Sequence, residues 1–144
     1  MRCAEVMSSP VRTISTEETA QSAARVMEEE NVGFLVVSDA KGHVVGVVTD
    51  RDLALRVLGR GAAHATTVGT IMSHPVVTCE PFDELVVAEA RMATRRVSRI
   101  VCVDERVHAV GVISLADFTT LEDGSHLART MKRVAPRETR KPPR

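Results

Sequence analysis

The chain has 144 residues, of which 44% are hydrophobic and three are aromatic, all Phe, and its formal net charge is zero. This length fits one compact domain or two very small ones, and the hydrophobic fraction is too high for a disordered chain. No apolar run of about eighteen residues is present, so no transmembrane helix is expected. Met1 to Glu5 lead into no apolar signal-peptide core, so we expect a cytoplasmic protein.

The zero net charge hides an asymmetry. Residues 125–144 carry seven basic side chains and one acid, a net charge of +6, so the other 124 residues carry −6. Three interpretations of this basic tail stay open: a flexible solvated end, an arm that docks on the acidic body, or a contact with nucleic acid or a partner. The tail has no aromatic residue for base stacking, so nucleic acid is not the partner that we expect.

The chain contains an internal repeat with an offset of 65 residues. Within it, 15 of the 48 residue pairs between 6–53 and 71–118 are identical, where chance gives roughly three. Both copies open on Met-Ser-x-Pro-Val, at Met7 and Met72. A duplicated structural unit is therefore the strongest signal in the sequence.

The first copy predicts a strand, a helix, a hairpin and a second helix. The helix should begin at the capping box formed by Ser15 and Glu18, because the apolar positions that follow recur at helical spacing. A short polar segment between two β-branched runs indicates the hairpin, and Gly59 should end the second helix. In chain order the expected elements are a strand at 11–14, a helix at 17–30, strands at 34–38 and 44–48, and a helix at 50–58.

The second copy predicts the same order. Its first helix should follow Pro81, and its elements are a helix at 82–95, strands at 99–103 and 109–113, and a helix from about Leu115. The expected fold class is therefore α/β (α+β), with tandem β-α-β-β-α repeats packed sheet to sheet as one module. The expected boundaries are repeat 1 at 6–59, a connector at 60–70, repeat 2 at 71–122 and the tail at 125–144.

A shared pattern joins the second hairpin strand to the second helix in each copy. It reads Gly-h-h-[Ser/Thr]-x-x-Asp, where h is apolar, at residues 46–52 and 111–117. The hydroxyl and the acid can simply cap the helix. The same two groups can also hold a phosphate at the helix N-terminus and the diol of a ribose. Both interpretations stay open on spacing alone.

The doubled patterns, together with the Met-Ser-x-Pro-Val-x-Thr segments, resemble a pair of CBS domains (the cystathionine β-synthase type) over residues 6 to about 121. The resemblance includes the stretch Thr-Asp-Arg-Asp-Leu at 49–53, which is common in stand-alone bacterial pairs. It implies a module that dimerises and binds AMP, ADP, ATP or S-adenosylmethionine in clefts between the repeats. It further implies that the ligand is regulatory and that no cofactor is required.

The resemblance also implies which residues would hold this ligand. Asp52 and Asp117 would bind ribose, and Thr49 and Ser114 would lie near ribose or phosphate. From its position between Thr49 and Asp52, Arg51 could add a phosphate contact. Arg99 would face phosphates in the second cleft. Adenine would be held mainly by backbone and apolar contacts at Thr13, Ile14, Val32, Gly33 and Phe34 in one cleft, and at Thr78, Cys79, Val97, Ser98 and Arg99 in the other.

The two clefts should differ in affinity, because Leu115 and Ala116 give the second motif none of the polar neighbours of the first. No catalytic motif is present, so we expect a non-enzymatic regulatory module that acts through an unknown effector protein and forms a homodimer. A structural dimerisation module without a specific ligand is the alternative.

Metal and disulfide sites are not expected. Cys3, Cys79 and Cys102 are an odd number without Cys-x-x-Cys spacing, which suits a reducing compartment. Cys102 reads as a small core residue, whereas Cys79 lies at the strand end that resembles the ligand cleft. His43 and His108 occupy equivalent hairpin positions and are interpreted as turn residues.

Overall fold

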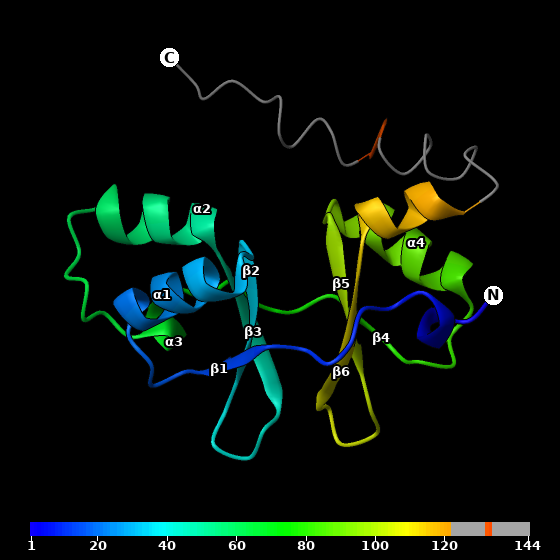
Figure 1. Cartoon of the computed structure of the whole chain (residues 1–144), viewed down its shortest axis with the longest axis horizontal. Helices are drawn as coiled ribbons and strands as arrows, with labels where there is room; N and C mark the ends of the chain where they lie inside the picture. Colours follow the sequence, from blue (N-terminus) through cyan, green and yellow to red (C-terminus); the bar gives the residue numbers. More distant parts are fainter. Residues whose placement is uncertain (122–131, 134–144) are drawn as a thin grey trace. The chain divides into compact units, whose positions relative to one another are not determined.

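A computed structural model describes residues 1–121 and 132–133, which form two compact units (Figure 1). The first, here called the β1–β3 unit, comprises Val11–Val76 and Glu105–Ala109. The second, the β4–β6 unit, comprises Met1–Pro10, Val77–Asp104 and the chain from Val110. Each unit contains one three-stranded sheet with helices, which confirms the expected mixed α/β class. Apart from Lys132 and Arg133, the basic tail lies outside the described residues.

The β1–β3 unit has a mixed sheet in the order β1-β2-β3. The central strand β2 runs parallel to β1 and antiparallel to β3, so the crossover between β1 and β2 carries a helix and the second connection is a hairpin. The elements are β1 (Thr13–Ser15), α1 (Ala20–Glu30), β2 (Phe34–Ser38), β3 (Val44–Thr49), α2 (Asp50–Asp52), a π-helix (Leu53–Leu58) and α3 (Val68–Ile71).

The first helix begins later than the sequence predicts, at Ala20 rather than residue 17. Ser15 is the last residue of β1, and its hydroxyl accepts a bond from the backbone N–H of Glu17 within a turn. Thr19 caps the helix instead, because its hydroxyl accepts from the N–H of Ser22 at 3.0 Å. The capping box predicted at Ser15 and Glu18 is therefore wrong.

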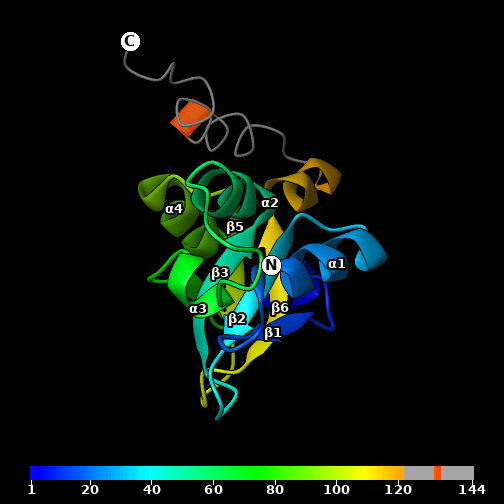
Figure 2. The same ribbon diagram turned by 90° about the vertical axis from the view of Figure 1, so that its left-hand side faces the viewer.

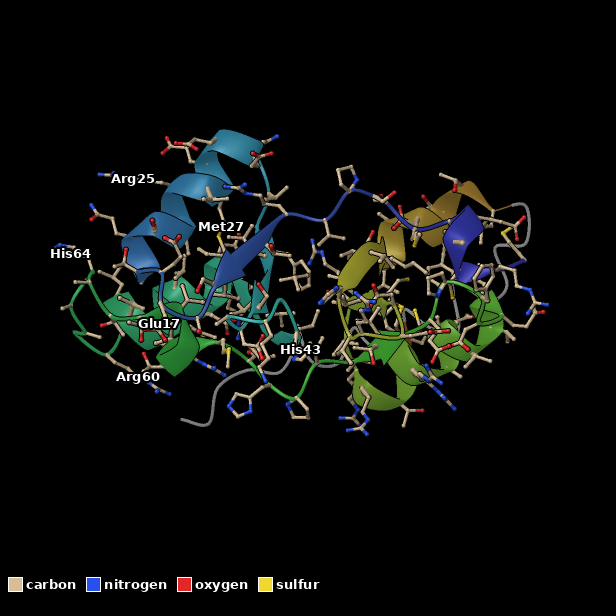
Figure 3. All side chains as sticks on the ribbon, turned by 90° about the horizontal axis from the view of Figure 1, so that it is seen from below. Glu17, Arg25, Met27, His43, Arg60 and His64 are labelled. Carbon is tan, nitrogen blue, oxygen red and sulfur yellow. The ribbon has the colours of Figure 1, made fainter. Side chains whose placement is uncertain are left out.

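The core of this unit lies between the sheet and its helices. Figures 1 and 2 show α1 and α3 against the same sheet. Figure 3 shows Met27 on the inner side of α1, whereas the exposed Arg25 points away from it. The buried cluster contains Ile14, Ala20, Ala23, Met27, Leu35, Val37, Val48, Val57, Val68 and Ile71.

The α3 helix was not expected, because its residues fall partly in the predicted connector at 60–70. It is held in place by backbone bonds from Val68 N–H to the oxygen of Glu18 and from Gly69 N–H to that of Thr16. Val68 and Ile71 then enter the core. A four-residue helix is too short to show a periodic apolar pattern in the sequence, and its formation depends on tertiary packing.

The β4–β6 unit repeats this plan, with the sheet order β4-β5-β6. Its elements are a 3-10 helix (Cys3–Glu5), β4 (Thr78–Cys79), α4 (Leu85–Arg95), β5 (Arg99–Val103), β6 (Ala109–Ser114) and a second 3-10 helix (Leu115–Thr120). The hairpin strands agree with the prediction to within one residue, whereas α4 begins three residues later than expected. The buried cluster contains Cys3, Cys79, Leu85, Ala88, Met92, Ile100, Cys102, Ile113 and Phe118.

The opening segment of each repeat packs within the unit that contains the other repeat's hairpin. Met72 lies over Gly46 in the β1–β3 unit, and Met7 lies over Gly111 in the β4–β6 unit. Reciprocal backbone bonds fix both segments: Ser73 with Val47, and Ser8 with Val112, at 2.8–3.1 Å. This exchange explains why the Met-Ser segment and the strand glycine both recur in the duplicated pattern.

Candidate functional site

The predicted site residues of the β1–β3 unit gather where β3 ends and a helix begins. Thr49, the last residue of β3, pairs with Phe34, the first residue of β2. The N–H of Asp50 donates to the oxygen of Gly33 at 3.1 Å, so the helix start is fixed to the strand start. Thr13 lies on the neighbouring strand, paired with Val36.

Thr49 and Asp52 cap the helix reciprocally. The hydroxyl of Thr49 accepts from the N–H of Asp52 at 3.1 Å, and an Asp52 carboxylate oxygen accepts from the N–H of Thr49 at 3.0 Å. This arrangement uses the spacing of three that the sequence pattern predicts. The capping interpretation is thus realised in the structure, and a ligand would have to share these groups.

Two further residues hold Asp52, and the sequence analysis missed both. The Ser73 hydroxyl lies 3.3 and 3.4 Å from the two carboxylate oxygens, and the Arg56 guanidinium forms an ion pair at 3.8 Å. Arg56 also donates to the backbone oxygens of Ile71 and Met72 at 2.9 and 3.0 Å. Arg56 was detectable in the sequence, because it lies four residues after Asp52 on a helix.

The β4–β6 unit contains the equivalent pair with fewer partners. One oxygen of Asp117, Oδ2, accepts from the N–H of Ser114 at 2.7 Å and from its hydroxyl at 3.0 Å. No described residue donates to the other oxygen, Oδ1. The N–H of Leu115 donates to the oxygen of Ser98 at 3.0 Å, so this helix start is fixed to β5 as its counterpart is to β2.

The remaining predicted residues differ in what they can offer a ligand. The side chains of Ile14 and Cys79 are buried in the two cores, which leaves only their backbone atoms for a contact. Arg51 and Arg99 are exposed, and Val32 is 41% exposed. The other predicted positions, which are half-buried, are Gly33, Phe34, Thr78, Val97 and Ser98.

The two hairpin histidines come together in the structure. The rings of His43 and His108 stack with centroids 5.9 Å apart, and both residues belong to the β1–β3 unit. His43 also lies 3.5 Å from the Asp39 carboxylate. Within residues 1–121 and 132–133, no group of three or more His, Cys, Asp or Glu side chains could hold a metal ion.

None of the helices in the described part of the chain is long and apolar enough to cross a membrane.

The chain matches the model of the CBS domain twice, at residues 3–59 and 68–123. The CBS domain-containing protein YhcV of Bacillus subtilis is 35% identical over 114 residues, which cover 79% of this chain and 80% of that protein. The two matched segments correspond to the two copies of the internal repeat.

Solved structures share the fold. The CBS domain protein PAE2072 from Pyrobaculum aerophilum, complexed with AMP, aligns with a TM-score of 0.76 at 22% identity and covers 94% of this chain and 98% of that chain. The CBS domain pair of protein MJ0100, in complex with 5′-methylthioadenosine and S-adenosyl-L-methionine, aligns with a TM-score of 0.74 at 23% identity, with coverages of 83% and 93%. With both repeats matched and the fold shared, the chain belongs to the CBS domain family.

Proposed function

We propose that the chain is a non-catalytic regulatory module that binds an adenosine-containing ligand, AMP, ADP, ATP or S-adenosylmethionine. One observation carries the proposal: each unit places a hydroxyl residue and an aspartate at a helix start that is fixed to the beginning of the neighbouring strand. The AMP and S-adenosylmethionine complexes of the related pairs support this ligand class.

The ribose would be held by the aspartates. In the β4–β6 unit, Oδ1 of Asp117 can accept from a ribose hydroxyl while Oδ2 keeps its bonds to Ser114. In the β1–β3 unit the ribose would replace the Ser73 hydroxyl, whose contacts with Asp52 are long at 3.3 and 3.4 Å. Ribose binding therefore need not break the helix cap in either unit.

The phosphates and the base would use the other residues of each set. Arg51 and Arg99 are exposed cations within these sets. In the repeats at 6–59 and 71–122, joined by the connector at 60–70, the proposed ligand-binding residues are Thr13, Ile14, Val32, Gly33, Phe34, Thr49, Arg51 and Asp52 in one unit, and Thr78, Cys79, Val97, Ser98, Arg99, Ser114 and Asp117 in the other.

Ligand-dependent thermal unfolding tests the proposal directly. The panel is AMP, ADP, ATP, S-adenosylmethionine and NADH, followed by calorimetry or an extrinsic dye because the chain has no Trp or Tyr. A ligand at 100 times its Kd adds about 2.7 kcal/mol to the stability of the folded state. For a chain of this size that is a rise in Tm of roughly 5–10 °C.

Charge-matched variants locate the site. Asp52→Asn and Asp117→Asn should each reduce the ligand-induced rise, and the double variant should abolish it. Glu18→Gln removes the same charge from an exposed position and should keep the full rise. The change in Tm on adding ligand is compared within each variant, so loss of a helix cap does not mimic loss of binding. An unshifted Tm with every adenosine compound at millimolar concentration would refute the sensor function.

The alternative is a structural dimerisation module without a specific ligand. The contacts of Asp52 with Thr49, Ser73 and Arg56 favour this alternative, because they explain the carboxylate as a structural group without any ligand. The same thermal panel decides between the two functions. In either case we infer a homodimer and an unknown effector protein, and light scattering after size-exclusion chromatography checks the dimer.

A further inference from the structure

The β4–β6 unit contains a cluster of three thiols in its core. Cys3, Cys79 and Cys102 are each at most 1% exposed and belong to one buried cluster. The Sγ atoms of Cys79 and Cys102 lie 3.2 Å apart, and Cys3 belongs to the same cluster, with its Sγ 4.0 Å from the backbone oxygen of Glu84. Cysteines that are far apart in the sequence, without any Cys-x-x-Cys spacing, therefore converge in the fold.

The repeat shows that the fold does not require thiols at these positions. Subtracting or adding the offset of 65 places Cys79 on Ile14 and Cys102 on Val37, and Cys3 corresponds to Val68. All three counterparts are buried aliphatic residues in the core of the β1–β3 unit. The same core layer is thus built once from aliphatic side chains and once from cysteines.

Two of these cysteines have the backbone placement that a disulfide needs. Cys79 on β4 and Cys102 on β5 are directly paired in a parallel register. Neighbouring strands lie about 4.8 Å apart, and disulfides span Cα separations of about 4.4–6.8 Å. The bond can therefore form by side-chain adjustment within an intact sheet.

We propose that Cys79 and Cys102 are a redox modification site, oxidised by hydrogen peroxide to a reversible intramolecular disulfide. One thiolate attacks a peroxide oxygen, the O–O bond breaks, and the released hydroxide takes a proton to become water, leaving a sulfenic acid. The second thiol then attacks that sulfur, the S–O bond breaks, and a second water leaves with the thiol proton. The two thiols are oxidised and one peroxide is reduced to two waters.

Burial sets the rate of this reaction. Burial raises the pKa of Cys3 to about 12, and contact with Cys102 together with burial raises the pKa of Cys79. Few thiolates are present at neutral pH, so oxidation is slow and accelerates when the core opens locally. Cys3, in the 3-10 helix Cys3–Glu5, belongs to the same buried cluster as the pair, and backbone bonds from Cys3 N–H to the oxygen of Asp83 and from Ala4 N–H to that of Pro81 hold this helix.

Thiol counting by mass spectrometry tests the proposal. The full chain is treated with hydrogen peroxide, unfolded in denaturant with a thiol-alkylating reagent, and weighed intact. The expected product carries one label instead of three and has lost two hydrogens, and a reductant restores all three labels. Peptide mapping should join Cys79 to Cys102. Three labels after peroxide, a sulfinic acid, an intermolecular bond or a link to Cys3 would each overturn the assignment.

The repeat supplies matched variants. Cys102→Val and Cys79→Ile introduce the residues that the β1–β3 unit uses at these positions, and each should retain both remaining labels after peroxide. Cys3→Val should still form the bond, at the rate of the wild type, because valine is the residue that the β1–β3 unit packs at this core position and the backbone bonds of the helix are kept. A Cys3→Val chain that keeps both of its labels after peroxide would overturn the assignment to Cys79 and Cys102. None of these measurements uses a ligand, so their failure is independent of the proposed adenosine binding.

Discussion

The two units hold equivalent aspartates in different surroundings. The carboxylate of Asp52 is bound by Thr49, Ser73 and Arg56, whereas that of Asp117 is bound by Ser114 alone among the described residues. The residue equivalent to Arg56 is Leu121, which packs against the apolar core instead. Duplication therefore copied the helix cap, while residues outside the motif determine how much of each carboxylate is available to a ligand.

The largest expected loss of stability comes from adding a side chain to the strand glycines on which Met7 and Met72 pack. A Cβ on Gly111 would lie 2.8 Å from Cβ of Met7, and one on Gly46 would lie 3.2 Å from Cβ of Met72. A clash near the backbone cannot be relieved by side-chain rotation, so Gly111→Ala should destabilise more than Gly46→Ala. We expect losses of about 1–3 kcal/mol in urea unfolding.

Shortening the methionines is the control for this prediction. Met7→Gly, which removes the overlapping Cβ, should recover stability in the Gly111→Ala background but lower it in the wild type, which a double-mutant cycle detects. Purely additive losses would contradict the predicted overlap.

Removing the aspartates should reproduce the difference in their surroundings. Asp52→Ala loses the cap and leaves Arg56 and Ser73 without their carboxylate, so we expect a cost of about 2 kcal/mol. Asp117→Ala loses only the bonds to Ser114 and should cost about 1 kcal/mol. Asp50→Ala, an exposed acid in the same turn as Asp52, should change stability by less than about 0.5 kcal/mol in the same urea titrations. Equal costs for Asp52 and Asp117 would show that the additional partners of Asp52 contribute nothing.

Exchanging the equivalent residues of the two hairpin turns should change the free energy of unfolding in opposite directions. Gly42 and Val107 are equivalent positions with φ of +81° and +62°, a region that a β-branched residue enters only with strain. Val107→Gly should therefore stabilise the protein by about 1 kcal/mol, and Gly42→Val should destabilise it by at least as much. Chemical denaturation measures both, and a loss of stability in Val107→Gly would refute strain at this turn.

The smallest effect concerns the hairpin acid Asp39. Backbone N–H groups of His43 and Lys41 donate to its carboxylate, and the bond from His43 is the main cause that lowers its pKa below 3.8. A depressed folded-state pKa contributes stability above the unfolded pKa, and this contribution is lost as the pH falls through the folded value. Asp39→Asn should therefore flatten the fall in Tm below pH 4 and leave its slope above pH 5 unchanged.

Local patterns predict the elements that have a clear period or turn. The hairpin strands around Gly42 and Val107 follow from β-branched runs, and the start of the helix after Thr49 follows from its capping pair. Thr19 was overlooked because Ser15 and Glu18 match the capping-box spacing, although Ser15 pairs in β1. The pairing of Ser15 with Ser38 of β2 therefore prevents Ser15 from capping the helix, and such pairing depends on residues that are distant in the sequence.

Contacts between distant segments are the part that local patterns cannot supply. Ser73 reaches Asp52 only because the second repeat's opening segment joins the β1–β3 unit. The spacing of the three cysteines does not predict the thiol cluster, yet the offset of 65 aligns each of them with a core residue of the other copy. Repeat alignment therefore contains tertiary information that single motifs do not.

The exchange of opening segments has a practical consequence for cutting the chain. A fragment that ends in the connector keeps Gly46 but loses Met72, and it keeps Met7 without Gly111. Each fragment would therefore lack the Met-Ser segment that packs on its own strand glycine. Mixing the two fragments would supply both missing segments. Cleavage between residues 60 and 67 should accordingly yield fragments that complement one another in solution, with the methionine-over-glycine contacts as the recognition element.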